Sequence, residues 1–337
     1  MNLFIYCLSV LSLILPLSTR ADNNQTVIVY SILTDYANQL GQEFRKETGI
    51  KVQAIHMRGS GIALARIQSE APQPRGDVWF CGSLGAHAQG AYEGLLEPYR
   101  PTAYELLSPQ FRDPLGANRV TGLYTGILGL LVNVDYLKKK SLPVPSSWED
   151  LTEPRYRGMI SIRTPLTSGT AYTTLITLVK LLGEDKAFRY QRHFYNGASE
   201  FTKRQTEQVV AGHKGIGIMF AHDAMDAIQA FKNLNVNLNF VIPKEGTGFE
   251  IGGLSLIKNG PNPQAAKQFI NFAVSKRGQE ILALHGYRYP VHRQVKINSG
   301  ALKLQDVPLV DIDFKWAGQQ RQRLLQRWQR EIHITRD

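Results

Sequence analysis

The stretch Met57–Glu70, with the sequence MRGSGIALARIQSE, indicates how the rest of the chain folds. It follows Val52–His56, which has the pattern of a strand, and its own apolar residues recur at helical spacing after a turn at residues 58–61. A Gly-Ser-Gly turn directs free backbone N–H groups and the positive end of the helix dipole toward one point, beside the Ser60 hydroxyl. The turn therefore predicts a site for an anion or a polar oxygen, with a plain helix cap at Ser60 as the alternative.

A second turn of this kind lies at residues 167–170 and precedes the predicted helix Ala171–Leu182. It contains Ser168, Gly169 and Thr170, again a small residue between hydroxyl side chains. Two helix starts that face one cleft hold a ligand from both sides, because each directs its own N–H groups at the same point. The pair of turns therefore predicts a clamp for a small anionic ligand.

The first 21 residues differ in composition from the remainder. Leu3–Leu17 is almost continuously apolar and is followed by Ser18–Ala21. A run of about fifteen apolar residues is short for a membrane span, and small residues stand at the cleavage positions. We therefore expect a cleavable signal peptide at residues 1–21 and export to the periplasm, with an uncleaved anchor as the alternative, because no Lys or Arg precedes the apolar core.

Charge and cysteine content limit the possible partners. Removal of the signal peptide takes away Cys7 and leaves Cys81 as the single cysteine, which excludes an internal disulfide. The formal net charge of +11 falls to +10, because Arg20 is the one charged residue removed. Export and the lack of a recognisable nucleic-acid module argue against nucleic acid, so the basic balance favours a small anion.

Strands and helices alternate from residue 27 onward. Val27–Ser31, Ile50–His56 and Asp77–Cys81 are predicted strands separated by helices, which is the pattern of parallel βαβ units in an α/β fold. Ligands of such open sheets bind beyond the carboxyl ends of the strands. The candidate binding residues at these ends are Ser31, Thr34, Arg58, Ser60, Gly61 and Ser83. Each of them is also an ordinary turn residue.

Two segments are predicted to cross between domains, for which 337 residues are sufficient. Tyr124–Asn133 has no solvent-compatible face and is predicted to be a buried strand that leads into a second domain. Thr247–Ile257 is predicted to lead back. The expected division is lobe 1 at residues 22–123 plus 250–313 and lobe 2 at residues 124–249.

The end of the chain carries two further features. Residues 286–291, GYRYPV, are predicted to form a rigid, exposed segment. The C-terminal segment 314–337 is predicted to be an amphipathic helix over residues 314–332, with Trp316, Leu324, Leu325, Trp328 and Ile332 on one stripe. Arg321, Arg323, Arg327 and Arg330 fall mostly off that stripe. They predict a solvated basic face, with a partner surface as the alternative.

Several segments, in order, resemble one protein family. They are VIVYSILTD, RGSGIALARIQSE, GDVWFCGS, RTPLTSGTAYTTL, GIGIMFAHDA, PKEGTGFEIGGLSLIKNGPNPQAAKQFINF and GYRYPV. The chain resembles the bacterial extracellular solute-binding proteins of ABC transporters, in the branch that binds ferric ions, phosphonates and sugar phosphates. The resemblance covers roughly residues 26–293 and implies two lobes, each a mostly parallel sheet flanked by helices, two crossover strands, and a hinged cleft that closes on its ligand.

The resemblance also bears on the ligand. It implies that residues 168–170 stand where ferric-ion binders hold a phosphate or carbonate anion. Those binders carry two adjacent tyrosines where this chain has His222 and Asp223, and the first strand turn lacks the histidine of a ferric site. Since Fe³⁺ loses its best ligands without tyrosinates, a metal site of His222, Asp223 and Glu250 is the alternative rather than the preferred interpretation.

The preferred interpretation is a polyol that bears a phosphate or phosphonate. The helix start at residues 168–170 would take the charged oxygens, with Arg58 or Arg204 adding a bidentate contact. The hydroxyl groups would be held by His222, Asp223 and Glu250. Because carboxylates repel a purely anionic ligand, they imply hydroxyls or an ammonium on the same molecule. Sugar phosphate is preferred and aminoalkylphosphonate is the alternative. A cap by Asp223 on the helix from Ala224 is compatible with both.

Other classes of function receive less support. A triad of Ser31, Ser60 or Ser168 with His222 and Asp223 is disfavoured, because adjacent His and Asp residues cannot readily orient one another. No G-x-S-x-G elbow, H-E-x-x-H motif or paired-cysteine metal signature occurs, so we expect neither an enzyme nor a cofactor. The expected partner of this monomer is an ABC permease, with a membrane histidine kinase as the alternative.

Overall fold

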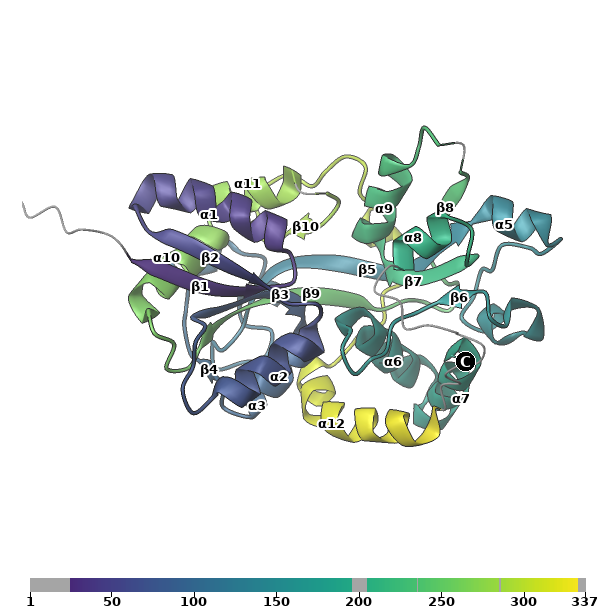
Figure 1. Cartoon of the computed structure of the whole chain (residues 1–337), viewed down its shortest axis with the longest axis horizontal. Helices are drawn as coiled ribbons and strands as arrows, with labels where there is room; N and C mark the ends of the chain where they lie inside the picture. The colour runs from purple at the N-terminus through teal and green to yellow at the C-terminus, as the bar shows by residue number, and fades with distance from the viewer. Residues whose placement is uncertain (1–24, 196–204, 235, 285, 333–337) are drawn as a thin grey trace, which may run out of the picture.

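The computed structural model describes residues 25–195, 205–234, 236–284 and 286–332, which form two lobes joined by long strands (Figure 1). We call lobe 1 the elements that pack around strands β1, β2 and β3. They are β1 (Thr26–Ser31), α1 (Thr34–Thr48), β2 (Lys51–His56), α2 (Ser60–Glu70), β3 (Val78–Ser83), α3 (Leu84–Tyr92), β4 (Leu96–Glu97), α4 (Pro109–Arg112), α10 (Pro263–Ala273), α11 (Lys276–Leu284) and β10 (Tyr289–Pro290).

Lobe 2 consists of the elements that pack around strands β6 and β7. They are α5 (Val134–Lys139), β6 (Ile160–Ser161), α6 (Gly169–Leu182), α7 (Glu184–Tyr195), α8 (Gln205–Val210), β7 (Ile216–Phe220), α9 (Ala221–Ala230) and β8 (Leu238–Val241). Short 3₁₀ helices lie at Tyr104–Leu106, Asp150–Thr152, Pro154–Tyr156 and Leu304–Asp306. The last element is helix α12 (Phe314–Glu331).

Strands β5 (Thr121–Asn133) and β9 (Phe249–Ile257) connect the lobes. Residues 121–127 of β5 pair with β9, and residues 128–133 pair with β7 and β8 of lobe 2. Every residue of β5 is buried, as its lack of a solvent-compatible face predicts. Figure 1 shows β5 and β9 running side by side between the two groups of helices. The lobe boundaries predicted at residues 123/124 and 249/250 stay a prediction.

The two-lobed α/β fold is confirmed, but the pairing of the strands is mixed. The strand order is β2-β1-β3-β9-β5-β7-β6, with β4, β8 and β10 attached to the long strands. Parallel pairing is confined to β1 with β2 and β3, and to β6 with β7. Every pair that involves β5 or β9 is antiparallel, because these two strands run between the lobes in opposite directions. The expectation of mostly parallel sheets was therefore wrong.

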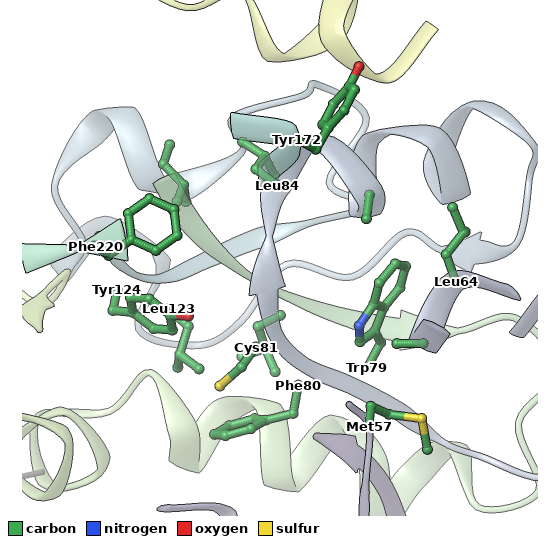
Figure 2. Close-up of a cluster of buried hydrophobic side chains, with 14 of the residues drawn as sticks. Met57, Leu64, Trp79, Phe80, Cys81, Leu84, Leu123, Tyr124, Tyr172 and Phe220 are labelled. Atoms are coloured by element: carbon green, nitrogen blue, oxygen red, sulfur yellow. The ribbon is translucent and has the colours of Figure 1, made fainter. Parts of the chain in front are cut away.

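A hydrophobic core fills the space on both sides of the sheet. Figure 2 shows part of it, with Trp79, Phe80 and Leu84 from lobe 1 and Tyr172 and Phe220 from lobe 2. One cluster of buried side chains contains residues of both lobes, so the lobes are packed against each other rather than separated by solvent. Cys81 is a free, buried thiol within this cluster.

The C-terminal helix α12 differs from its sequence-based interpretation in one respect. Leu324, Leu325 and Trp328 are buried, as the predicted apolar stripe requires. Arg321 is also buried, with 5% of its surface exposed, so the basic residues do not all form a solvated face. In the described part of the chain, no helix combines the length and apolarity needed to cross a membrane.

Candidate ligand-binding site

A cavity of about 160 Å³, which we call the inner cavity, lies between the lobes where β1 and β3 end and α2, α6 and α9 begin. It brings together candidate residues from five separate segments of the sequence. The candidates that line it are Ser60, Ser83, Ser168, Gly169, Thr170, His222, Asp223 and Glu250. The arrangement agrees with the rule that open sheets bind ligands beyond the carboxyl ends of their strands.

One side of the inner cavity, which we call the oxyanion side, is made by the starts of α2 and α6 and the end of β3. The Ser168 hydroxyl caps α6 by accepting a hydrogen bond from Ala171 N at 3.3 Å. The amides at the first positions of α6 have no acceptor within the helix, because helix geometry leaves the first N–H groups without an intrahelical partner. The side is therefore polar, and the Arg163 guanidinium beside the start of α2 gives it a positive charge, so it suits the oxygens of an anion.

The end of β3 places a hydroxyl at this side through an irregularity in the strand. Cys81 and Gly82 have φ values of 67° and 105°, and the pairing register with β9 shifts between Phe80 and Ser83. A bulge of this kind redirects the following side chain. Ser83 N then donates to Ser60 Oγ at 3.0 Å, and Ser83 Oγ donates to Glu250 Oε2 at 3.0 Å.

The two helix starts meet across the cleft through backbone atoms. Gly61 N donates to the Thr167 carbonyl oxygen at 3.1 Å. A Cβ atom placed on Gly169 would lie 2.2 Å from Ser83 Oγ and 2.5 Å from Ser60 Oγ, which only a glycine permits. The lobes are therefore closed over the oxyanion side in this structure.

The other side of the inner cavity, which we call the acidic side, contains His222, Asp223, Glu250 and Arg288. His222 Nε2 lies 3.6 Å from Asp223 Oδ1 and 3.6 Å from Glu250 Oε1. Asp223 Oδ1 accepts a hydrogen bond from Arg288 Nη2 at 3.0 Å. The Asp223 carboxylate therefore already has a cationic counter-charge before any ligand is considered.

Burial determines the charge state of the remaining groups on the acidic side. Burial raises the pKa of Glu250 to about 7, against the opposing effect of the hydrogen bond from Ser83. Burial and the nearby Arg288 guanidinium hold the pKa of His222 well below its usual range. At neutral pH the imidazole is uncharged and Glu250 is close to half protonated, so the acidic side carries little net negative charge.

The structure places several predicted residues away from the inner cavity. Ser31 is fully buried at the end of β1 and is not part of the cavity wall. Arg58 is exposed and is not part of the cavity wall, although its carbonyl oxygen accepts a hydrogen bond from Arg163 Nη2 of lobe 2 at 2.7 Å. Gly61 serves the contact between the lobes instead of the cavity wall. Arg204 lies outside the described residues.

Thr34 lines a second and larger cavity, which we call the outer cavity. Its volume is about 540 Å³, and its wall includes Ile32, Leu33 and Arg288, which also line the inner cavity. The Thr34 hydroxyl forms a hydrogen bond with His56, with 2.7 Å between Oγ1 and Nδ1. The two cavities therefore adjoin each other along three shared residues.

The sequence interpretation missed six side chains in the wall of the inner cavity, namely Ile32, Leu33, Tyr124, Arg163, Phe220 and Arg288. Arg163 directly precedes the turn at residues 164–168, and this place in the sequence was the feature that could have predicted its position in the cavity wall. Arg288 lies in the segment that was expected to be exposed, yet only 7% of its surface is exposed. That segment pairs with β5 as strand β10, which turns the guanidinium inward over the Tyr124 ring, 5.5 Å from its centroid.

Comparisons with known proteins agree with the two-lobed fold. The periplasmic binding protein AfuA from Actinobacillus pleuropneumoniae, solved with exogenous fructose-6-phosphate bound, is 35% identical, with a TM-score of 0.86 over 92% of this chain and 98% of that chain. The periplasmic binding protein P5PA is 30% identical, with a TM-score of 0.85 over 92% of this chain and 100% of that chain. An uncharacterised protein of Haemophilus influenzae is 33% identical over 96% of this chain and 95% of its own.

More distant relatives include a protein named for iron uptake and one whose name proposes 2-aminoethylphosphonate binding. These relatives are solute-binding proteins and not enzymes, in agreement with the prediction that this chain is not an enzyme. A family described as bacterial extracellular solute-binding protein matches residues 83–315. The chain belongs to this family of bacterial extracellular solute-binding proteins, of the ABC-transporter type.

Proposed function

We propose that this chain captures a phosphorylated polyol, most simply a hexose phosphate, and delivers it to an ABC permease. The phosphate would lie at the oxyanion side, where the first amides of α6 and the Ser60 hydroxyl converge beside Ser83, whose own hydroxyl donates to Glu250. The sugar hydroxyls would lie at the acidic side and bond to His222, Asp223 and Glu250. The observation that carries this proposal is the ion pair between Arg288 and Asp223.

The ligand could carry either hydroxyls or an ammonium beside its phosphate, and the ion pair between Arg288 and Asp223 helps to decide between them. An ammonium requires an unpaired carboxylate, whereas Asp223 is paired with Arg288 and Glu250 is close to half protonated at neutral pH. Arg163 also lines the cavity and would repel a cation. Neutral hydroxyls of the ligand can donate hydrogen bonds to the Asp223 carboxylate. They can donate to or accept from the His222 imidazole and the Glu250 carboxyl group. The charges therefore favour a sugar phosphate over an aminoalkylphosphonate.

The dimensions of the site support a ligand larger than inorganic phosphate. The inner cavity, at about 160 Å³, is smaller than the roughly 300 Å³ at which small-molecule pockets usually begin. The adjoining outer cavity adds about 540 Å³ on the far side of Arg288. A sugar phosphate has room if its phosphate lies at the oxyanion side and its hydroxyl-bearing chain passes along the acidic side toward the outer cavity. The fructose-6-phosphate in the solved relative supports the same ligand class.

An iron site receives less support from the same side chains. The oxygen of Asp223 that lies nearest His222 is the one that accepts from Arg288, so a metal ion would have to compete with a guanidinium for it. Within the described ranges, no group of three or more His, Cys, Asp or Glu side chains is arranged to hold a metal ion. Tyrosinate, the preferred partner of Fe³⁺ in the resembling proteins, is replaced by His222 and Asp223.

Calorimetric titration of the purified chain tests the proposed ligand. The ligands are fructose-6-phosphate, inorganic phosphate, 2-aminoethylphosphonate and ferric citrate. We expect fructose-6-phosphate to bind with the lowest Kd. Tightest binding of the aminophosphonate would contradict the charge argument, and tightest binding of iron would replace the proposal with the metal-binding alternative.

The substitution Asp223→Ala tests the division of roles within the site. It should lower the affinity for fructose-6-phosphate roughly tenfold or more, which is the usual cost of losing a hydrogen bond to a charged group. It should change the affinity for inorganic phosphate far less. Gln229→Ala is the control on the same helix, since Gln229 is exposed and lines neither the inner nor the outer cavity. Equal losses for both ligands in the Asp223 variant would contradict the proposed roles.

The cellular role follows the same proposal. The apolar leader at residues 1–21 would be cleaved during export to the periplasm, which N-terminal sequencing of the secreted chain measures directly. Adjacent genes for a permease and an ATPase would support import, and adjacent genes for a sensor kinase and response regulator would support the signalling alternative.

A further inference from the structure

Helix α12 is anchored to both lobes. Near its start it packs against α3 of lobe 1 so closely that a Cβ on Gly318 would lie 2.4 Å from Ala88 Cβ. Near its end it packs against α7 of lobe 2, where Trp328 Nε1 donates to Gln191 Oε1 at 3.3 Å and the rings of Trp328 and Tyr195 lie 5.0 Å apart. Figure 1 shows α12 running beneath both groups of helices. Any hinge motion of the lobes therefore has to change at least one of these two contacts.

Ion pairs add to the contact with lobe 2. Arg323 donates to both carboxylate oxygens of Glu184, and Arg327 reaches Glu184 and Asp185, at distances of 2.7 to 2.8 Å. Arg323 and Asp185 are exposed, whereas Glu184 and Arg327 are half-buried, so solvent screens each pair on at least one side and each contributes modestly. The ion pairs therefore orient α12 on α7 but leave α12 able to move relative to lobe 2.

Arg321 lies between the two anchoring contacts and is the buried cation of the helix. Its Nη1 donates to Gln89 Oε1 of α3 at 3.0 Å, and its guanidinium carbon lies 5.2 Å from the centroid of the Tyr172 ring of α6. The guanidinium is therefore held between a side chain of lobe 1 and an aromatic face of lobe 2. Among the described residues, no carboxylate lies within ion-pair distance of it.

The same guanidinium lies directly behind the oxyanion side. Its Nη2 lies 3.1 Å from the position that a Cβ on Gly61 would occupy, and that position is 2.2 Å from the Leu166 carbonyl oxygen. Gly61 is the residue whose N–H crosses the cleft to Thr167. Arg321 thus lies against the backbone contact that brings the starts of α2 and α6 together.

We propose that Arg321 is a positioning residue that stabilises the closed arrangement of the lobes and thereby raises ligand affinity without touching the ligand. The contacts with Gln89 and Tyr172 belong to different lobes, so both are available only when the lobes are closed. A ligand that binds the closed form gains apparent affinity in proportion to the fraction of the protein that is closed. The effect on affinity rests on the proposed function, whereas the effect on closure does not.

Two substitutions at position 321 and one control on the same helix test the proposal. Arg321→Met keeps the length of the side chain and removes a buried charge that has no carboxylate partner, a replacement that usually preserves or increases stability. Arg321→Lys keeps the charge but loses the planar contact with Tyr172. Arg330→Gln removes the same charge from an exposed position of α12.

The first measurement is the affinity and dissociation rate of fructose-6-phosphate and inorganic phosphate. We expect Arg321→Met to lower the affinity for both ligands by the same factor, roughly fivefold or more. The loss should come from faster dissociation and should not be accompanied by a loss of thermal stability. Arg321→Lys should recover part of this affinity, and Arg330→Gln should match the wild type. Unchanged affinity in Arg321→Met, or a loss of affinity that only accompanies a loss of stability, would overturn the proposal.

The second measurement separates this proposal from the proposed ligand. Spin labels on Glu47→Cys of α1 and Lys139→Cys of α5, both exposed positions, report the distance between the lobes without any ligand, and the native Cys81 thiol is buried from the label. Arg321→Met should shift the distance distribution toward the open form. If wild-type protein binds no phosphate compound, the proposed function fails while this shift still tests Arg321. An unchanged distribution would contradict the role of Arg321 itself.

Discussion

The two sides of the inner cavity are built by different means. The oxyanion side consists of backbone amides and hydroxyls supplied by two short turns, and its character follows from local helix geometry. The acidic side consists of His222, Asp223 and Glu250, whose charge depends on burial and on Arg288, a residue 65 positions away from Asp223. A motif can therefore supply the amides and hydroxyls of an anion site, whereas the charge balance of the acidic side requires the folded chain.

The substitution expected to have the largest effect acts on the oxyanion side. Gly169→Val would place side-chain atoms where Ser60 Oγ and Ser83 Oγ already lie, at 2.5 and 2.2 Å from the Cβ position. The lobes could not close, and we expect calorimetry to detect no binding of fructose-6-phosphate. Lys180→Ala, at an exposed position of the same helix, is the control. Retained binding in the valine variant would show that this contact is not required.

The next effect concerns the acidic side. Arg288→Met leaves Asp223 without its counter-charge, so the carboxylate faces the ligand phosphate directly and sugar phosphate affinity should fall by roughly tenfold. The relative affinity for 2-aminoethylphosphonate should rise, because an unpaired carboxylate attracts its ammonium. The double variant Arg288→Met/Asp223→Asn should recover part of the loss. A double variant as weak as Arg288→Met alone would contradict the counter-charge argument.

A smaller effect is expected in the pH dependence of stability. The Glu250 pKa of about 7 lies above its ordinary value of 4.5, so the folded protein binds more protons than the unfolded chain between these values. Its contribution is fully present below pH 4.5 and is lost as the pH rises through 7, a total of up to about 3 kcal/mol. Glu250→Gln should therefore lose less stability than the wild type between pH 5 and 8, measured by denaturant unfolding.

The low pKa of His222 changes stability with pH in the opposite direction to that of Glu250. His222 is present in both the wild type and the Glu250→Gln variant. A neutral imidazole in the folded state opposes protonation, so its contribution to stability is lost as the pH falls below its ordinary value of 6.5. The difference between wild type and Glu250→Gln isolates the carboxyl group. Parallel stability curves for the two proteins would show that Glu250 does not titrate in this range.

The smallest expected effect is at a residue that sequence reasoning placed in the site. Arg58→Ala removes an exposed guanidinium, whereas the contact with Arg163 uses the Arg58 carbonyl oxygen, which the substitution retains. We expect sugar phosphate affinity to change by less than about twofold, the size of a typical exposed charge contribution. A larger loss would indicate that the guanidinium reaches the ligand in solution.

Sequence reasoning was most accurate where a property follows from neighbouring residues. The buried strand β5 and the helix starts at Ser60 and Ser168 lie where the sequence predicts them. The predicted helix start at Ala224 was wrong: α9 begins at Ala221, so His222 and Asp223 lie in its first turn and Asp223 does not cap it. Sequence reasoning was also wrong where a property depends on the pairing of distant segments. The strands are mixed because β5 and β9 run between the lobes in opposite directions, and Arg288 is buried because β10 pairs with β5.

Local sequence patterns are sufficient to predict the alternation of strands and helices, the two turns that expose helix amides, and the side chains available to bind a ligand. These properties depend on residues within one or two turns of each other, so periodicity and turn chemistry reveal them. The tertiary structure decided which side chains share the cavity, which of them are charged, and that Arg321 lies between the lobes. Burial and long-range ion pairing control these properties, and neither exists until segments far apart in the sequence are brought together.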